Sequence, residues 1–280
     1  YKDIIDNSSN NSTVFNAVLQ NLVDQKFPVN DDMKEDAATI IKQIKSAYKS
    51  NYGDNYKDSL NQALTSAGYK NLSEYRQKMI KQIQYANFLL DYIDDHFDDV
   101  FNDYYQQCAP KYVSLIKISV SDTSSPTDDE TSKLNEVKEL ISNTDKSFGD
   151  IAQDYSNDST SSKKGSLGIV DSKDTSGIAN SYGKDVFNAI EALSEGQVSD
   201  VITGDNGYYF VKVTSTDKKT LKKELKKTDI DSPLLAYDDY LQYVVYNSYK
   251  INYKDKDIKK IVQEVVNKAL EERKTERGEA

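Results

Sequence analysis

The sequence predicts an α+β protein in which a mixed α/β module interrupts an otherwise helical chain. In the first 110 residues, apolar side chains recur at the three- and four-residue spacing of amphipathic helices. At Tyr112 the pattern changes to the run YVSLIKISV, whose β-branched and aromatic residues predict a strand. Helical spacing returns at Lys218. We therefore expect three segments, which are residues 1–110, 111–216 and 217–280.

The N-terminal segment predicts a series of helices separated by proline and glycine. The first ends at Pro28, and the second begins with acidic residues and ends at Gly53. The third ends at Gly68, since glycine favours the left-handed conformation at a helix end. We expect Ser73 to be the N-cap of the fourth helix. A short acidic helix precedes Pro110.

The middle segment continues with two predicted helices, DDETSKLNEVKELISN and SFGDIAQDYS. The stretch YSNDSTSSKKGSLGIV follows, and its polar residues give way abruptly to two glycines around a leucine. It is not a phosphate-binding loop, because its lysines precede the glycine and the spacing differs from that motif. A helix at DVFNAIEAL and a hairpin at VSDVITGDNGYYFVKVT complete the segment.

The C-terminal segment predicts two helices, PLLAYDDYLQYVVYNSY and KDIKKIVQEVVNKALEERK. A segment of roughly 60 residues is short for an independent hydrophobic core. We therefore expect it to pack with the N-terminal segment into one all-α lobe, into which the α/β module is inserted. Such an insertion requires the first and last strands of the module to lie side by side.

Composition argues against several classes of function. The net charge of −10 gives no basic face for nucleic acid. No apolar run approaches the roughly 18 residues of a membrane span. The single cysteine, Cys108, excludes an internal disulfide, and we expect it to be a buried apolar residue. The aspartate-rich run around His96, the only histidine, lacks the glycine and ligand spacing of an EF-hand, and we expect no metal and no cofactor.

The order of a strand, helices, YSNDSTSSKKGSLG, a helix ending in LSEGQVS and the hairpin GYYFVKV resembles the parvulin family of peptidyl-prolyl cis-trans isomerases. The flanks VLQNLVDQKF, YGDNYKDSLNQALTSAGY and FNDYYQQCAPKYVSLIKI resemble PrsA-type extracytoplasmic foldases, which have a SurA-like helical chaperone lobe. The resemblance implies a four-stranded antiparallel sheet surrounded by helices. It also implies isomerisation of X-Pro bonds, for which an apolar proline pocket and a few polar groups beside the twisted amide suffice.

Both histidines that parvulin sites usually carry are replaced in this chain. Leu115 stands in SLIKI where the family has S-H-I-L, and Tyr209 stands in GYY where the family has G-Y-H. Asp158, in YSND, holds the position of the family's Cys or Asp. The resemblance assigns the catalytic positions to these three residues, and we expect them to be vestigial. Core packing is the alternative for Leu115 and Tyr209, and a turn is the alternative for Asp158.

The resemblance also assigns a substrate pocket. Leu167, in GSLG, would form its floor, and the other expected substrate-binding residues are Tyr182, Val186, Phe187 and Asn206. The alternative for the apolar members is ordinary core packing, because a proline pocket is itself apolar.

The expected function is that of an extracytoplasmic foldase or chaperone for secreted proteins, with weak or lost isomerase activity. The alternative is a fully active isomerase that uses Asp158 and Tyr209 in place of the histidines. We expect unfolded or partly folded secreted proteins and X-Pro segments as partners, and no nucleic acid. Exposed tyrosine stripes are expected to bind them, and these consist of Tyr104, Tyr105, Tyr237, Tyr240 and Tyr243.

The resemblance implies a location on the outer face of the cell membrane of a Gram-positive bacterium. Attachment would then depend on an N-terminal lipid anchor that precedes Tyr1. A homodimer through the helical lobe is compatible with the sequence, which does not require one.

Overall fold

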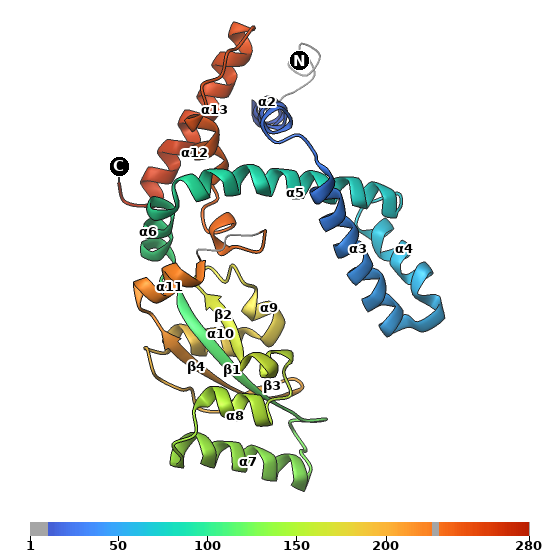
Figure 1. Ribbon diagram of the computed structural model, residues 1–280, viewed down its shortest axis with the longest axis vertical. Helices are drawn as coiled ribbons and strands as arrows, with labels where there is room; N and C mark the ends of the chain where they lie inside the picture. Colours follow the sequence, from blue (N-terminus) through green and yellow to red (C-terminus); the bar gives the residue numbers. More distant parts are fainter. Residues whose placement is uncertain (1–10, 226–229, 280) are drawn as a thin grey trace. The chain divides into compact units, whose positions relative to one another are not determined.

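A computed structural model describes residues 11–225 and 230–279 (Figure 1). The chain divides into two compact units. One consists mainly of the residues up to Phe97 and those from Asp238 onward, and we call it the helical unit. The other spans Asp98–Thr228 and Ser232–Tyr237, and we call it the sheet unit. The fold is α+β, with the sheet unit inserted between the two parts of the helical unit, as the sequence predicts.

The sheet unit is built on four antiparallel strands in the order β2-β1-β4-β3. The strands are β1 (Lys111–Ser119), β2 (Ser166–Val170), β3 (Ile202–Gly204) and β4 (Gly207–Ser215). The long strands β1 and β4 are neighbours at the centre of the sheet, so the chain enters and leaves this unit at adjacent positions. This pairing meets the geometric condition for an inserted module.

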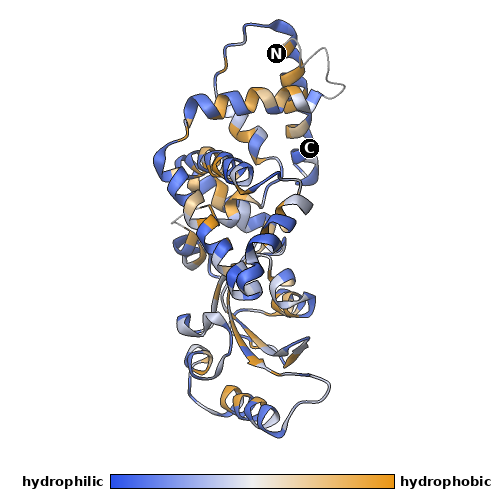
Figure 2. Cartoon of the chain, turned by 90° about the vertical axis from the view of Figure 1, so that its right-hand side faces the viewer, coloured by the Kyte–Doolittle hydropathy of each residue, from blue (hydrophilic) through white to orange (hydrophobic). Residues whose placement is uncertain are grey.

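Helices cover both faces of the sheet. On one face, α7 (Asp128–Asn143) and α8 (Phe148–Tyr155) bury a core that includes Ile116, Ile118 and Phe210. Figure 2 shows α7, the lowest helix, with apolar residues on one side and hydrophilic residues on the other. On the other face, α9 (Ile178–Tyr182) and α10 (Lys184–Ala192) bury a second core. Strand residues alternate between the faces, so Leu115 and Tyr209 both point into this second core.

Two further helices pack with the sheet unit, α6 (Phe97–Cys108) and α11 (Lys218–Leu225). Tyr104, fully buried on α6, donates a hydrogen bond of 2.8 Å to the buried carboxylate of Asp171, just after β2. Asp171 also accepts hydrogen bonds from the backbone N–H groups of Lys173 and Thr175 and from the Thr175 hydroxyl. The buried carboxylate is therefore surrounded by donors, as a charge in a protein interior requires.

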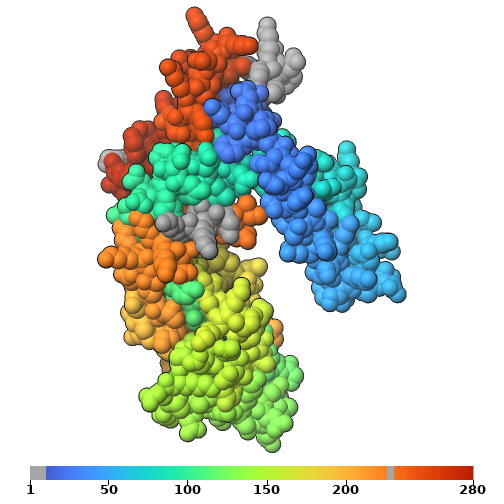
Figure 3. All heavy atoms as spheres, viewed as in Figure 1, coloured from blue at the N-terminus to red at the C-terminus, as the bar shows by residue number. Residues whose placement is uncertain are grey.

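From residue 11 onward, where the structure describes the chain, the N-terminal part of the helical unit contains four α-helices and a short 3₁₀ turn. They are α2 (Asn11–Lys26), α3 (Asp31–Tyr52), η1 (Gly53–Asn55), α4 (Tyr56–Ser66) and α5 (Leu72–Asp95). In Figure 3, α3 and α4 form the blue to cyan arm, and α3 also packs against α5 through Met33, Ile41 and Ile80. The expected N-cap of α5, Ser73, is wrong. The cap is Asn71, whose side chain accepts a hydrogen bond from the backbone N–H of Glu74.

The C-terminal part contains α12 (Leu241–Ser248) and α13 (Lys256–Glu276). The single helix expected over PLLAYDDYLQYVVYNSY is wrong, because a 3₁₀ turn, η3 (Pro233–Leu235), is separated from α12 by a break at Asp238. The Asp238 side chain is 3% exposed and lies 2.8 Å from Arg273 Nε and 2.9 Å from Arg277 Nη2. This ion pair, together with a hydrogen bond from the Tyr240 N–H, holds Asp238 in a non-helical conformation.

The tyrosines expected to bind clients do not form an exposed surface. The expectation is wrong for Tyr104 and Tyr237, which are buried, and Tyr105, Tyr240 and Tyr243 are half-buried. In the sheet unit, Tyr104 and Tyr237 are buried, and Tyr105 donates to the Thr216 carbonyl. In the helical unit, the Tyr240 hydroxyl donates to Glu276, and the ring of Tyr243 stacks on Phe15 with centroids 4.8 Å apart. Each of these tyrosines therefore has a partner within its own unit, and local sequence spacing does not reveal which partner that is.

Candidate functional site

The sheet unit contains a pocket of about 460 Å³ on the face covered by α9 and α10. It opens between these two helices and the hairpin of β3 and β4. Its walls include Tyr182 at the end of α9, Val186 on α10, Ile202 on β3, and Asn206 and Tyr209 from the hairpin. Four expected site residues, Tyr182, Val186, Asn206 and Tyr209, therefore line one pocket.

Tyr209 is one wall of this pocket and is 4% exposed. Its hydroxyl donates a 2.9 Å hydrogen bond to Asn206 Oδ1, and its ring meets Tyr182 edge to face at a centroid distance of 6.2 Å. The ring lies directly over Gly204, where a Cβ would come within 2.6 Å of Tyr209 Cε2. Glycine at this position therefore lets the aromatic ring pack closely against the hairpin backbone.

Leu115, at the other histidine position, is fully buried on β1. It is paired with Val211 across the sheet, and its N–H donates to the Gly165 carbonyl at 2.8 Å. Its side chain packs in the same core as Tyr209 but is not among the pocket walls. An alkyl side chain has no proton to give or take, so Leu115 contributes packing beneath the pocket.

Asp158 connects to the pocket through Tyr182. Its carboxylate caps the 3₁₀ helix η2 (Ser159–Lys163) by accepting from the Thr160 N–H at 2.9 Å and the Thr160 hydroxyl at 2.7 Å. The Tyr182 hydroxyl donates to the same oxygen, Oδ1, at 3.4 Å. Burial and the neighbouring Asp158 carboxylate raise the pKa of Tyr182 to about 12. Tyr182 thus keeps its proton at neutral pH and remains a hydrogen-bond donor.

Leu167 and Phe187 are half-buried and pack against the core beneath the pocket. Neither is among the residues that line the pocket itself. Leu167 lies on β2, beside Gly168, whose φ of 80° turns the strand at an irregularity in its pairing with β1.

Sequence reasoning did not single out Lys117, which belongs to the same side of β1 as Leu115. Its Nζ lies 5.7 Å from the centroid of the Tyr209 ring, a cation–π arrangement. Its Cε comes within 3.4 Å of where a Cβ on Gly207 would lie. Lys117 could have been identified from SLIKI, because it is two residues after Leu115 and therefore lies on the same face of the strand.

The pocket walls combine apolar side chains, such as Val186 and Ile202, with polar and charged ones that include Lys184, Asp185 and Asp205. The Asp158 carboxylate is not a wall and reaches the pocket through Tyr182. The described part of the chain gathers no three histidine, cysteine or acidic side chains that would hold a metal ion. This arrangement can enclose a small apolar ring and offer a neutral donor beside it.

Part of the chain is similar to known proteins. Residues 115–215 match the family model for the rotamase, or PPIC-type PPIase, domain. Over 141 residues the chain is 32% identical to the foldase protein PrsA of Staphylococcus epidermidis and to that of Staphylococcus aureus. These alignments cover 48% of this chain and 41% of each relative, so the match spans about two fifths of the relatives' length.

Solved structures of PrsA align over most of the chain. The PrsA of Streptococcus pneumoniae covers 94% of this chain and 93% of its own, with 20% identity and a TM-score of 0.44. The PrsA of Bacillus subtilis covers 94% and 92%, with 22% identity and the same TM-score of 0.44.

Proposed function

Because the chain is PrsA-like and carries a PPIC-type rotamase domain, we propose that it is an extracytoplasmic foldase in which peptide binding dominates and prolyl isomerisation is weak. Its substrates are unfolded or partly folded secreted proteins and their X-Pro segments. The observation that carries this proposal is the pocket of about 460 Å³ that Tyr182, Val186 and Tyr209 share. The apolar side chains among its walls, Val186 and Ile202, offer a surface for a proline ring, which needs burial rather than covalent chemistry.

Weak isomerisation follows from the groups around this pocket. A twisted X-Pro amide has lost its resonance and is stabilised by polar groups aimed at it. The Tyr209 hydroxyl is already bonded to Asn206, and Leu115 has no polar atom. Asp158 is engaged by Thr160 and Tyr182. A substrate must compete with these internal hydrogen bonds, so Tyr209 and Asp158 are poorly available to stabilise the transition state.

The alternative is a fully active isomerase in which Asp158 and Tyr209 replace the histidines. One observation favours it, since the Asp158–Tyr182 hydrogen bond of 3.4 Å joins the carboxylate to the pocket wall. This bond is long and yields readily to a substrate carbonyl.

Refolding limited by prolyl isomerisation separates these candidates. The uncatalysed step takes tens to hundreds of seconds, which leaves room to detect weak catalysis. At micromolar enzyme we expect a modest acceleration, which Tyr182→Ala abolishes. Tyr155→Ala is the control, because Tyr155 packs on the opposite face of the sheet, and this variant should keep the wild-type rate. Acceleration that depends strongly on Asp158, with loss in Asp158→Asn, would favour the alternative.

Client binding is measured independently by suppression of aggregation of a denatured protein. We expect the full chain to suppress aggregation when isomerisation is silent, for example in Tyr182→Ala. If the full chain neither suppresses aggregation nor accelerates refolding, the proposed function is refuted.

We also propose a location on the outer face of the membrane of a Gram-positive bacterium, since the matched PrsA proteins come from such organisms. Within the part of the chain that the structure describes, no helix has the length and apolarity needed to cross a bilayer. A lipid anchor and a homodimer remain part of the proposal. Incorporation of a radioactive fatty acid into the protein tests the anchor in cells, and sedimentation of the purified chain tests the dimer.

A further inference from the structure

The helical unit offers little apolar surface to a client. Among the described residues of the whole chain, the large hydrophobic side chains classed as exposed are Tyr52 and Ile230. The tyrosines expected to form a binding surface are instead engaged within their own units. A foldase with little exposed apolar surface needs another way to hold an unfolded chain. Hydrogen bonds to the backbone of that chain would serve.

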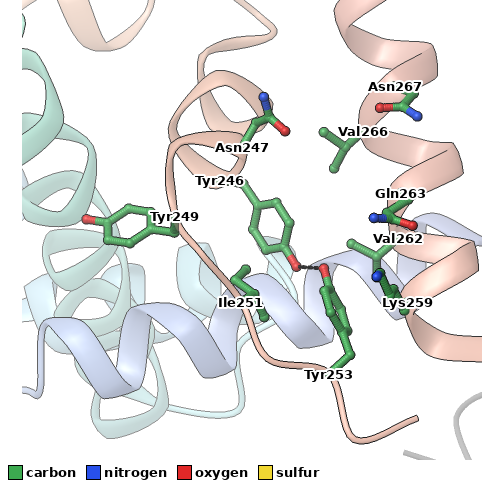
Figure 4. Close-up of a pocket in the computed structure, with 10 residues that line it drawn as sticks. All are labelled: Tyr246, Asn247, Tyr249, Ile251, Tyr253, Lys259, Val262, Gln263, Val266 and Asn267. Atoms are coloured by element: carbon green, nitrogen blue, oxygen red, sulfur yellow. Dashed lines mark hydrogen bonds between the residues drawn. The ribbon is translucent and has the colours of Figure 1, made fainter. Parts of the chain in front are cut away.

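A pocket of about 230 Å³ lies in the helical unit between α13, the end of α12 and the loop that follows α12 (Figure 4). We call it the amide groove. Its apolar floor includes the buried side chains of Val262, Val266 and Tyr246. Such a floor gives any segment lying in the groove a dry surface to rest on.

Three amide side chains converge on this groove: Asn247 from α12, and Gln263 and Asn267 from α13. All three are exposed, and the structure records no hydrogen bond from them to another described residue. Figure 4 shows Asn247 across the groove from Asn267, with Gln263 one turn along the same helix. Each amide carries two donor hydrogens and an acceptor oxygen, so the groove presents unsatisfied capacity of both kinds.

A tyrosine pair fixes one wall. The hydroxyls of Tyr246 and Tyr253 are 2.5 Å apart and share a hydrogen bond, drawn as a dashed line in Figure 4. Burial and this bond raise the pKa of Tyr246 well above its ordinary value, so Tyr246 keeps its proton. Tyr249 is directed away from the groove, since its ring stacks on Phe88 with centroids 5.5 Å apart. Because these side chains are already held in place, they lose little conformational entropy when a ligand binds.

We propose that the amide groove binds an extended backbone segment of an unfolded polypeptide. This inference rests on the proposed function and names where the helical unit holds its client. Residues four apart on a helix, such as Gln263 and Asn267, repeat about every 6 Å along its axis. Alternate residues of an extended chain repeat about every 6.6 Å. The two amides therefore match peptide groups two residues apart, while Asn247 meets the segment from its other side.

Backbone recognition suits a client of unspecified sequence, because every residue except proline offers the same N–H and C=O groups. Exposed Lys259, one turn before Gln263, adds a cationic donor for a carbonyl oxygen at the end of the groove. The groove has no carboxylate among its lining residues, so it does not repel acidic segments.

The test uses the full chain and a fluorescent, capped, uncharged peptide of about eight residues, with binding followed by anisotropy. The double variant Gln263→Leu/Asn267→Leu keeps helix-compatible side chains of similar size but removes both amides. We expect about tenfold weaker binding, which corresponds to about 1.4 kcal/mol and to the net value of one or two hydrogen bonds. The matched control is Gln43→Leu/Gln77→Leu, which removes exposed amides from α3 and α5 of the same unit and should bind as wild type.

A second probe asks whether the backbone is what the groove recognises. The same peptide with alternate amide nitrogens methylated retains its side chains but loses alternate donors, and we expect it to bind at least tenfold more weakly to wild type. Equal binding of the two peptides, or equal binding by wild type and the Gln263/Asn267 variant, would overturn the proposal while leaving foldase activity intact. Tight binding of a β-1,4-linked N-acetylglucosamine oligomer in place of the peptide would assign the groove to a saccharide. Absence of any peptide binding by wild type, with neither aggregation suppression nor accelerated refolding, would refute the proposed function as well.

Discussion

Two glycines in the GSLG stretch provide a matched pair for testing how the sheet unit is built. Gly165 and Gly168 have nearly the same positive φ, 76° and 80°. A Cβ on Gly165 would lie 2.4 Å from the Leu115 carbonyl oxygen and 2.8 Å from the Ala152 Cβ. A Cβ on Gly168 would meet no atom within 4 Å. The variants Gly165→Ala and Gly168→Ala therefore share a backbone penalty and differ in a collision.

The shared penalty is the left-handed conformation, which costs a residue with a Cβ about 1–2 kcal/mol. Reduced freedom of the unfolded chain offsets about 0.4–1 kcal/mol of this in both variants. At Gly165 the obstacle is strand backbone, which cannot rotate aside as a side chain would. Overpacking of this kind costs about 1–3 kcal/mol. Loss of the Leu115 N–H bond to the Gly165 carbonyl adds about 1 kcal/mol. The free energy of unfolding should thus fall by about 2–4 kcal/mol more in Gly165→Ala than in Gly168→Ala.

Native-state hydrogen exchange with mass spectrometry measures this difference in the free energy of unfolding within the sheet unit itself. Peptides from β1 and β4 report on opening of the sheet, and peptides from α3 and α5 serve as an internal reference in the other unit. The expected difference corresponds to roughly 30- to 900-fold faster exchange in Gly165→Ala than in Gly168→Ala. If both variants exchange alike, the close approach of Gly165 to β1 does not stabilise the sheet, and our account of this loop fails.

Three other changes probe buried and capping interactions. Asp238→Asn removes the carboxylate that the guanidinium groups of Arg273 and Arg277 contact, and we expect urea unfolding to show a loss of about 3 kcal/mol. An unchanged unfolding midpoint would contradict this. Tyr104→Phe leaves the buried Asp171 carboxylate without one donor and should cost about 1.5–3 kcal/mol, measured by thermal melting. Backbone N–H groups, including that of Thr127, lower the pKa of Glu130 to about 2 from its ordinary 4.5. Its stabilisation is therefore present above pH 4.5 and lost as the pH falls toward 2, and Glu130→Gln should flatten stability across that window in an acid titration followed by circular dichroism.

Much of the fold follows from sequence pattern. The helix predicted at DDETSKLNEVKELISN coincides with α7, since a capping box of Thr127 and Glu130 marks its start. The N-cap of α5 was harder to predict, because Asn71 and Ser73 are both good caps and only the accepted Glu74 N–H distinguishes them. The break at Asp238 escapes sequence reasoning for another reason. Its cause is an ion pair with arginines far along the chain, which local spacing does not reveal.

The candidate site is also only partly predictable from the sequence. Motif order is enough to name Tyr182, Val186, Asn206 and Tyr209, which line one pocket. Motif order does not indicate that Tyr209 bonds to Asn206, because that contact depends on a rotamer and on the close approach of the ring to Gly204. The amide groove was not predicted either, since Asn247 comes from a different helix than Gln263 and Asn267. Sequence periodicity shows which residues share one face of a helix. It does not show which other helix that face packs against.

The adjacency of β1 and β4 also sets an order of assembly. A chain that emerges N-terminus first exposes β1 long before its central partner exists, since Lys117 pairs with Tyr209. The helical unit is completed later still, because α2 packs against α13, which is near the C-terminal end of the chain. In the sequence, the sheet unit lies between the two parts of the helical unit. The sheet unit can therefore fold before all of the helical unit has been made. A protein proposed to protect unfinished chains therefore passes through a prolonged unfinished state of its own during synthesis or export.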